Sequence, residues 1–158
     1  MAVEFHDNSV KVKAALNDAI IQFLHDAGMI VESDAVSNTK GVDTGQLKNS
    51  WNYIVDESKS EVVIGSPLEN AIWTELGTGE YALEGNGRKD PWFIPVEGYT
   101  GKRKPTYEGK IVVVYGKDGT AFYKTNGKKP KRMLHNAFVK NKAKIIRRAE
   151  SILKGKMQ

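Results

Sequence analysis

The sequence predicts an α+β fold: an antiparallel sheet of about four to five strands, with a long N-terminal helix and a C-terminal helix packed on one face. Near both ends of the 158-residue chain, apolar residues recur every three or four positions, which is the period of an amphipathic helix. Between these stretches, two segments change to the two-residue period of strands. The length suits a single domain over residues 1–158 with one core.

The N-terminal helix is expected over residues 9–36, where charged and polar residues separate the apolar ones. Ser9 is expected to cap its start by accepting a hydrogen bond from an early backbone amide. Gly28 interrupts the helix, at a cost of about 1 kcal/mol relative to alanine. The apolar positions that define the helical face are Val12, Leu16, Ala19, Ile20, Phe23, Ala27, Ile30 and Val31.

Two β-hairpins are expected in the middle of the chain. The first covers residues 51–65, where alternating residues flank a polar turn. The second covers residues 110–125, with Asp118 and Gly119 as a strong turn signal between its strands. A short helix is expected at residues 69–76. This element order implies a sheet covered on one face by the two terminal helices.

A long connection, residues 77–109, lies between the hairpins and holds seven glycines and three prolines. Such a composition buries little surface, so we expect a long mobile loop or arm with a short strand near residues 92–96. Long loops of ordered domains usually have a binding role.

The C-terminal helix carries most of the basic charge. Residues 128–157 hold eleven Lys and Arg against the single acid Glu150, whereas residues 1–127 hold thirteen basic and eighteen acidic residues. Residues 128–157 therefore carry a net charge of +10 and residues 1–127 a net charge of −5, which together give the net charge of +5 of the chain. Pro130 is expected near the first turn. The apolar face of this helix is expected to comprise Leu134, Phe138, Asn141, Ile145, Ala149 and Ile152.

This charge division suits either an anionic partner such as nucleic acid or the stacking of identical subunits. The cations of the helix itself are equally well explained as a solvated surface. The cluster that precedes the helix is more concentrated, and its members are the candidate contacts to nucleic acid or another anionic partner: Lys128, Lys129, Lys131 and Arg132.

Composition excludes several classes of site. The chain has no cysteine, so disulfides, thiolate metal sites and cysteine nucleophiles are ruled out. Residues 1–10 contain no apolar run, so we expect no signal or transit peptide and a protein that is made and folded in the cytoplasm. The longest apolar stretch, residues 111–115, is too short to span a bilayer, so no membrane association is expected.

One motif raises the alternative of a homodimeric aspartic protease. Asp43, Thr44 and Gly45 form the triplet with which such enzymes place a carboxylate, and a second copy would supply the other carboxylate. The polar residues 37–41 before it, Gln46 after it and an expected helical turn at residues 47–50 count against this interpretation. A simpler role for Asp43 or Thr44 is to cap that short helix. The protease is kept as a remote alternative.

No other catalytic constellation is apparent. The three histidines, His6, His25 and His135, lack the fixed spacing of metal ligands. The glycine-rich stretches at residues 77–79 and 85–87 are better explained as turns than as phosphate loops. We therefore expect no enzyme activity, no cofactor and no metal.

Several short motifs occur in a specific order: Asp43-Thr-Gly-Gln-Leu47, Ser50-Trp51, Val63-Ile-Gly65, Ala71 to Gly79, and Thr125 to Pro130 leading to Met133. Over roughly residues 10–150 this order resembles the lambdoid gene-product-ten-like family of tailed-bacteriophage proteins. Those proteins are minor tail or head-tail joining components that complete the tail. The segment between Gly79 and Lys110 is similar to the longer variant found in phages and prophages of Gram-positive bacteria.

The resemblance implies a structural virion protein that acts through contacts with other neck or tail proteins. It implies a location in the virion, and in the host cytoplasm during assembly. A homo-oligomeric ring and non-specific contact with phage DNA are further expectations. The residues expected to contact partners or other copies are Glu75, Gly77, Thr78, Gly79 and Trp92. A basic DNA-binding protein without a virion role remains the main alternative.

Overall fold

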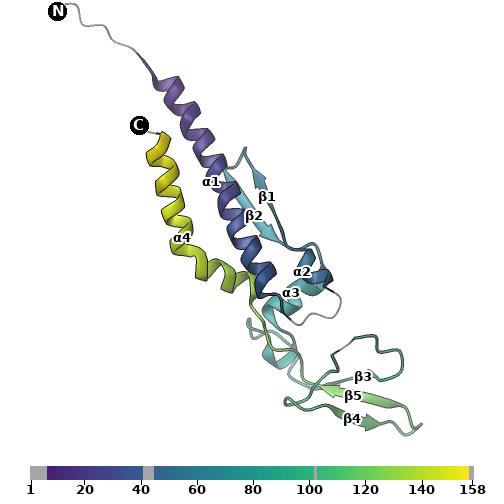
Figure 1. Ribbon diagram of the computed structural model, residues 1–158. Helices are drawn as coiled ribbons and strands as arrows, with labels where there is room; N and C mark the ends of the chain where they lie inside the picture. The colour runs from purple at the N-terminus through teal and green to yellow at the C-terminus, as the bar shows by residue number, and fades with distance from the viewer. Residues whose placement is uncertain (1–6, 41–44, 102, 157–158) are drawn as a thin grey trace, which may run out of the picture.

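The computed structural model describes residues 7–40, 45–101 and 103–156 and has the predicted α+β class (Figure 1). Both terminal helices, both hairpins, the helical turn after Gly45 and the short helix between the hairpins are confirmed. In chain order the elements are α1 (Ser9–Asn38), α2 (Gln46–Asn49), β1 (Asn52–Asp56), β2 (Glu61–Gly65), α3 (Glu69–Leu76), the 3-10 turn η1 (Gly79–Tyr81), β3 (Trp92–Pro95), β4 (Val112–Tyr115), β5 (Ala121–Thr125) and α4 (Met133–Lys156).

The strands form two antiparallel sheets, so the prediction of one sheet is wrong. β1 and β2 make a two-stranded sheet, and β3, β5 and β4 make a three-stranded sheet in that order. β3 pairs with β5, with Trp92 opposite Thr125, so β5 is the central strand of this sheet. α1 covers only the two-stranded sheet, and the three-stranded sheet lies beyond the end of the helix pair (Figure 1).

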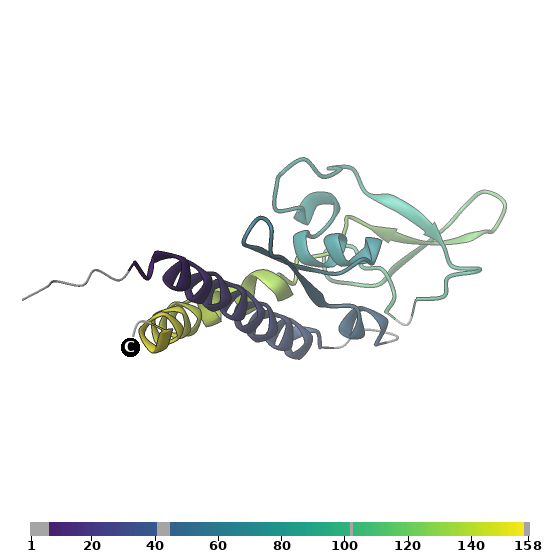
Figure 2. The ribbon, with the colours of Figure 1, turned by 90° about the horizontal axis from the view of Figure 1, so that it is seen from above.

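The terminal helices run antiparallel and pack along each other (Figures 1 and 2). Asp34 of α1 is paired with Lys140 of α4. Asp26, eight residues earlier in α1, is paired with Arg148, eight residues later in α4. On the same register, the first two turns of α1 project past the end of α4. Val12 and Leu16, predicted for the packed face, are accordingly exposed.

The core lies where the base of the helix pair meets α2 and α3. Trp51 is buried there, and its Nε1 donates a 2.8 Å hydrogen bond to Oγ1 of Thr39, just after α1. The buried members of this cluster are Val31, Ala35, Leu47, Trp51, Ala71, Met133 and Ala137.

Three predicted helix details need correction. Asn8, not Ser9, occupies the cap position of α1, and the carboxylate of Asp7 accepts a 2.9 Å hydrogen bond from the backbone N–H of Ser9. α4 begins at Met133, so Pro130 precedes its first turn. Phe138, predicted for the packed face of α4, is 49% exposed, because that face centres on Ala137 and on Asn141, which was predicted to lie there.

The connection between the hairpins contains more regular structure than its composition indicates. The expected short strand is confirmed as β3, and η1 precedes it. The expectation that this connection is mobile stays a prediction.

Candidate functional site

The two groups of candidate residues, far apart in sequence, meet in one place. Residues 74–80, at the end of α3, run beside residues 126–132, which lead into α4; we call this contact the junction. Three backbone bonds of 2.8–2.9 Å join the segments, donated by Thr78 to Lys128, by Glu80 to Asn126 and by Lys131 to Thr74. The junction therefore ties α3, the three-stranded sheet and α4 together.

Glu75 caps α4. Its carboxylate accepts hydrogen bonds from the backbone N–H groups of Leu134, at 3.0 Å, and His135, at 2.8 Å. These are amides of the first turn, which have no partner within the helix, and a negative charge at a helix N-terminus is favourable. The structure thus gives Glu75 an internal role; contact with a partner stays a prediction.

The glycines of the junction are explained by close packing. Gly77 and Gly79 have φ angles of 77° and 61°, a region that favours glycine. A Cβ at Gly79 would collide with the carbonyl oxygen of Asn126 and with the Trp92 ring. Trp92 is half-buried, and the guanidinium carbon of Arg88 lies 5.8 Å from its ring centroid.

The basic cluster is partly turned into the protein. Nζ of Lys128 donates a 2.8 Å hydrogen bond to Oγ1 of Thr74, and Nζ of Lys131 donates to the carbonyl of Lys40 at 3.4 Å. Nζ of Lys129 lies 5.5 Å from the centroid of the Tyr81 ring. Lys128 therefore holds the junction, and Lys131 links it to the end of α1; an anionic partner for the cluster stays a prediction.

An apolar pocket lies beside the junction, and sequence reasoning missed it. It has a volume of about 180 Å³ and is open to solvent. Ile72 and Trp73 are 56% and 50% exposed although they are large and apolar. The available signal was their adjacency on a short helix whose buried side uses Ala71 and Thr74. The lining residues are Ile72, Trp73, Leu76, Gly77, Ala82, Leu83, Glu84 and Asn86.

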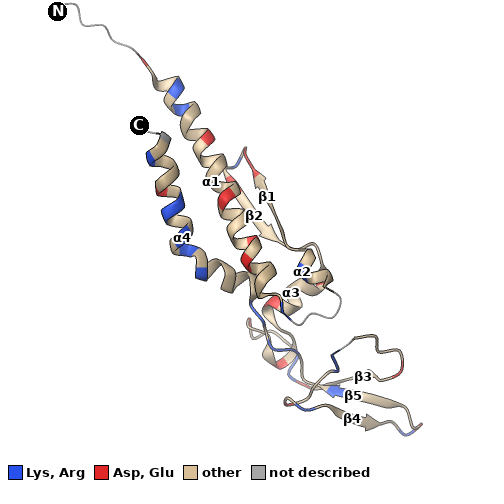
Figure 3. Cartoon of the chain, in the orientation of Figure 1, with Lys and Arg blue, Asp and Glu red and all other residues tan. Residues whose placement is uncertain are grey.

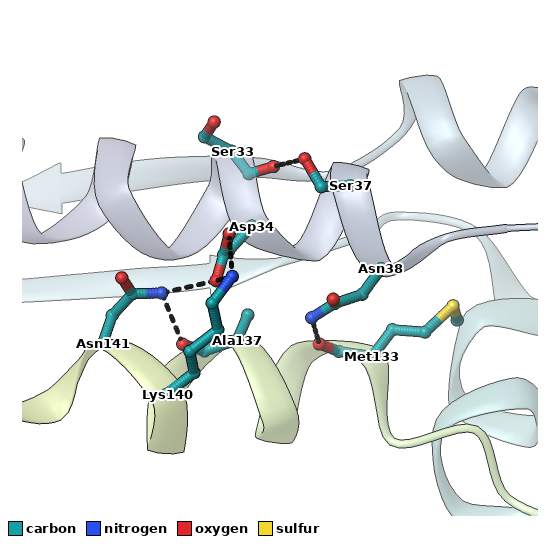
Figure 4. A network of polar contacts seen from close by, with 8 residues as sticks. All are labelled: Ser33, Asp34, Ser37, Asn38, Met133, Ala137, Lys140 and Asn141. Carbon is teal, nitrogen blue, oxygen red and sulfur yellow. Dashed lines mark hydrogen bonds and ion pairs between the residues drawn. The ribbon is translucent and has the colours of Figure 1, made fainter.

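The acidic charge of residues 1–127 and the basic charge of residues 128–157 are partly paired with each other within the chain (Figure 3). The Asp34 carboxylate accepts hydrogen bonds from Lys140, at 3.0 Å, and from the buried Asn141, at 2.7 Å (Figure 4). The hydrogen bond from Lys140 and then that from Asn141 hold the pKa of Asp34 below its usual value. Asp26 and Arg148 make a second bridge at 2.7 Å. The charge division therefore stabilises the helix pair, and its use between subunits stays a prediction.

Some of the remaining sequence candidates fall in parts of the chain that the structure does not describe. Asp43, Thr44 and His6 lie outside the described residues. His25 packs edge-on against the Tyr53 ring, at 5.9 Å between centroids. Across residues 7–40, 45–101 and 103–156, no three His, Asp or Glu residues gather as metal ligands would. In the same part of the chain, no helix combines the length and apolarity needed to span a membrane.

Comparison with known families bears on the part of the fold that holds the pocket. Residues 4–77 match the family described as Bacteriophage HK97-gp10, putative tail-component. The match confirms the predicted resemblance over these residues. The matched segment includes α1, α2, the β1–β2 hairpin and α3, and it ends at the junction. No curated protein and no solved structure matches the chain.

Proposed function

We propose that the chain is a structural virion protein of a tailed phage, located at the head-tail junction or the tail end. It works through protein-protein contacts and catalyses no reaction. The family match over residues 4–77 supports the tail assignment. The observation that carries the contact role is the solvent-open pocket with Ile72 and Trp73 on its wall.

The pocket is suited to an apolar side chain of a neighbouring neck or tail protein. Partly exposed aromatic and aliphatic residues around a concave site are the usual anchors of protein interfaces. In this arrangement Glu75 and Gly79 hold α3 against α4 and keep the pocket open, and Gly77 does so from the pocket wall. Thr78 and Trp92 support the same junction from the loop side. The part of the loop that lines the pocket, including Leu83, meets the partner directly.

Assembly takes place in the host cytoplasm, and the finished particle carries the protein. Neighbouring copies form a homo-oligomer around the tail axis, which places the basic cluster where passing DNA is contacted non-specifically. Opposite charges on neighbouring surfaces would favour such lateral contacts.

Complementation tests this function. A phage or prophage that lacks the gene is supplied with the wild-type chain, with Trp73→Glu or with Tyr115→Glu. Tyr115 is a matched control because it is also an exposed aromatic residue, at 74%, and lies at the far end of the three-stranded sheet. Trp73→Glu should fold normally by circular dichroism but leave DNA-filled heads and tails unjoined or incomplete in electron micrographs. Normal infectious particles from the phage without the gene would refute the proposal.

A further inference from the structure

The β1–β2 hairpin has an uncovered outer face. Strand alternation turns Tyr53 and Ile64 toward α1, so Ile54 and Val63 project from the other side. These two residues are directly opposite in the register and are 66% and 59% exposed. A two-stranded sheet covered on one face only is a weak unit, and an apolar cross-strand pair facing water indicates a missing layer.

The same outer face is acidic at its tip. The next pair on this face, two residues further along each strand, is Asp56 opposite Glu61. Like charges directly opposite one another are unfavourable. Asp56 is compensated by Lys59 at 3.2 Å, whereas Glu61 makes no ion pair within the described residues. The outer hairpin face therefore combines an apolar pair with uncompensated negative charge.

α4 has a second apolar stripe besides the one packed on α1. Val139, Ile146 and Leu153 are exposed and lie seven residues apart, so they follow one line along the helix. Lys142 lies beside this line on one side and Glu150 on the other, and Arg147 and Lys154 lie further round the helix on the side of Glu150. None of these three cations has an ion pair within residues 7–40, 45–101 and 103–156. We call this surface the outer stripe of α4.

The two surfaces lie on opposite flanks of the helix pair. Gly28 and His25 of α1 face the hairpin, whereas Asp26 and Asp34 face α4 from the other side of α1. Figure 1 shows the hairpin and α4 separated by α1. The hairpin of one chain therefore does not cover its own outer stripe.

We propose that the outer hairpin face of one copy packs on the outer stripe of α4 of a second copy. This inference rests on the proposed structural role and specifies how copies contact one another. The dimensions agree, since a five-residue strand extends roughly 17 Å and the fourteen-residue span from Val139 to Leu153 roughly 21 Å. Ile54 and Val63 meet the apolar stripe, and Glu61 meets its cations. The contact is head-to-tail, because each copy offers a different surface to each neighbour.

The absence of cysteine makes the contact directly testable by disulfide formation. Full-length Val63→Cys and Ile146→Cys proteins are purified separately, mixed at high concentration and oxidised. The pair should give the mixed disulfide about tenfold faster than Val63→Cys mixed with Tyr115→Cys, since docking raises the local thiol concentration. Adding Glu61→Lys to the Val63→Cys protein should remove that advantage. The same pair, co-expressed during phage assembly, should cross-link within particles.

Faster linkage of Ile146→Cys to itself than to Val63→Cys would show a symmetric α4–α4 contact and overturn the proposal. Absence of the mixed product both in concentrated protein and in particles would also overturn it. The cross-link reports contact between copies without reference to infection, whereas complementation reports the virion role without reference to self-contact. Failure of one is therefore distinguishable from failure of the other.

Discussion

The ring of Tyr53 on β1 lies directly against the backbone of Gly28 in the middle of α1. A Cβ at position 28 would overlap with ring atoms of Tyr53. His25, nearly one turn earlier, packs edge-on against the same ring. The glycine that weakens α1 as an isolated helix thus allows the hairpin to approach the helix backbone closely.

Gly28→Ala should therefore destabilise the protein. In a solvent-exposed helix this change would add about 1 kcal/mol of stability, but the overlap with Tyr53 costs about 1–3 kcal/mol, so a net loss is expected. Urea unfolding followed by circular dichroism measures it. In a Tyr53→Ala background the same change should become stabilising, because the overlap is gone. A gain in the wild-type background would contradict the packing described.

Glu75→Ala should lower the free energy of unfolding by about 1–2 kcal/mol, because two amides of α4 lose their acceptor and the helix loses a favourable N-terminal charge. Glu75→Gln should cost less, since the amide oxygen can still accept one bond. Glu97→Ala, at an exposed loop carboxylate, is the matched control and should change little. If Glu75→Ala abolished complementation with stability unchanged, direct partner contact would be its main role.

Local patterns predicted the elements well, because each element depends on residues close in sequence. The three-four spacing located α1, and Asp118-Gly119 located the β4–β5 hairpin. The separation into two sheets was beyond such reasoning, since β3 pairs with β5 across a long connection and nothing local specifies that choice.

For the candidate site too, sequence patterns located residues but did not predict their tertiary contacts. Motif order drew attention to Glu75 and the concentration of basic charge to Lys128, and the structure brings both into the junction. Their internal contacts were not predictable, because a capping carboxylate and a partner-binding carboxylate look the same in sequence. The pocket at Ile72 and Trp73 was missed because exposure is a tertiary property: an apolar pair on a short helix is equally compatible with a core.

Acid should weaken the helix pair through Asp34. Its pKa is lowered in the folded chain, first by the hydrogen bond from Lys140 and then by that from Asn141. The contribution to stability is therefore fully present above the ordinary Asp pKa of about 3.9 and is lost as the pH falls through the lowered value. Asp34→Asn should be less stable at neutral pH and should lose less stability between about pH 5 and pH 2. Equal acid sensitivity of the variant and the wild-type chain would contradict this assignment.

Duplex DNA binding by the purified chain should depend on Lys129 and Arg132 more than on Lys128 and Lys131. Each phosphate contact contributes about −0.9 to the slope of log affinity against log salt, so four engaged cations would give about −3.6. Lys128 donates a hydrogen bond inside the junction and Lys131 donates one to the carbonyl of Lys40, so the cluster should contribute no more than about −1.8. Lys129→Gln and Arg132→Gln should each reduce the slope by about 0.9, whereas Lys128→Gln should reduce stability instead. The DNA-binding alternative would be favoured over the virion role by three results together. The salt slope would fall equally with all four changes, duplex binding would be tight, and phage assembly would be normal without the protein.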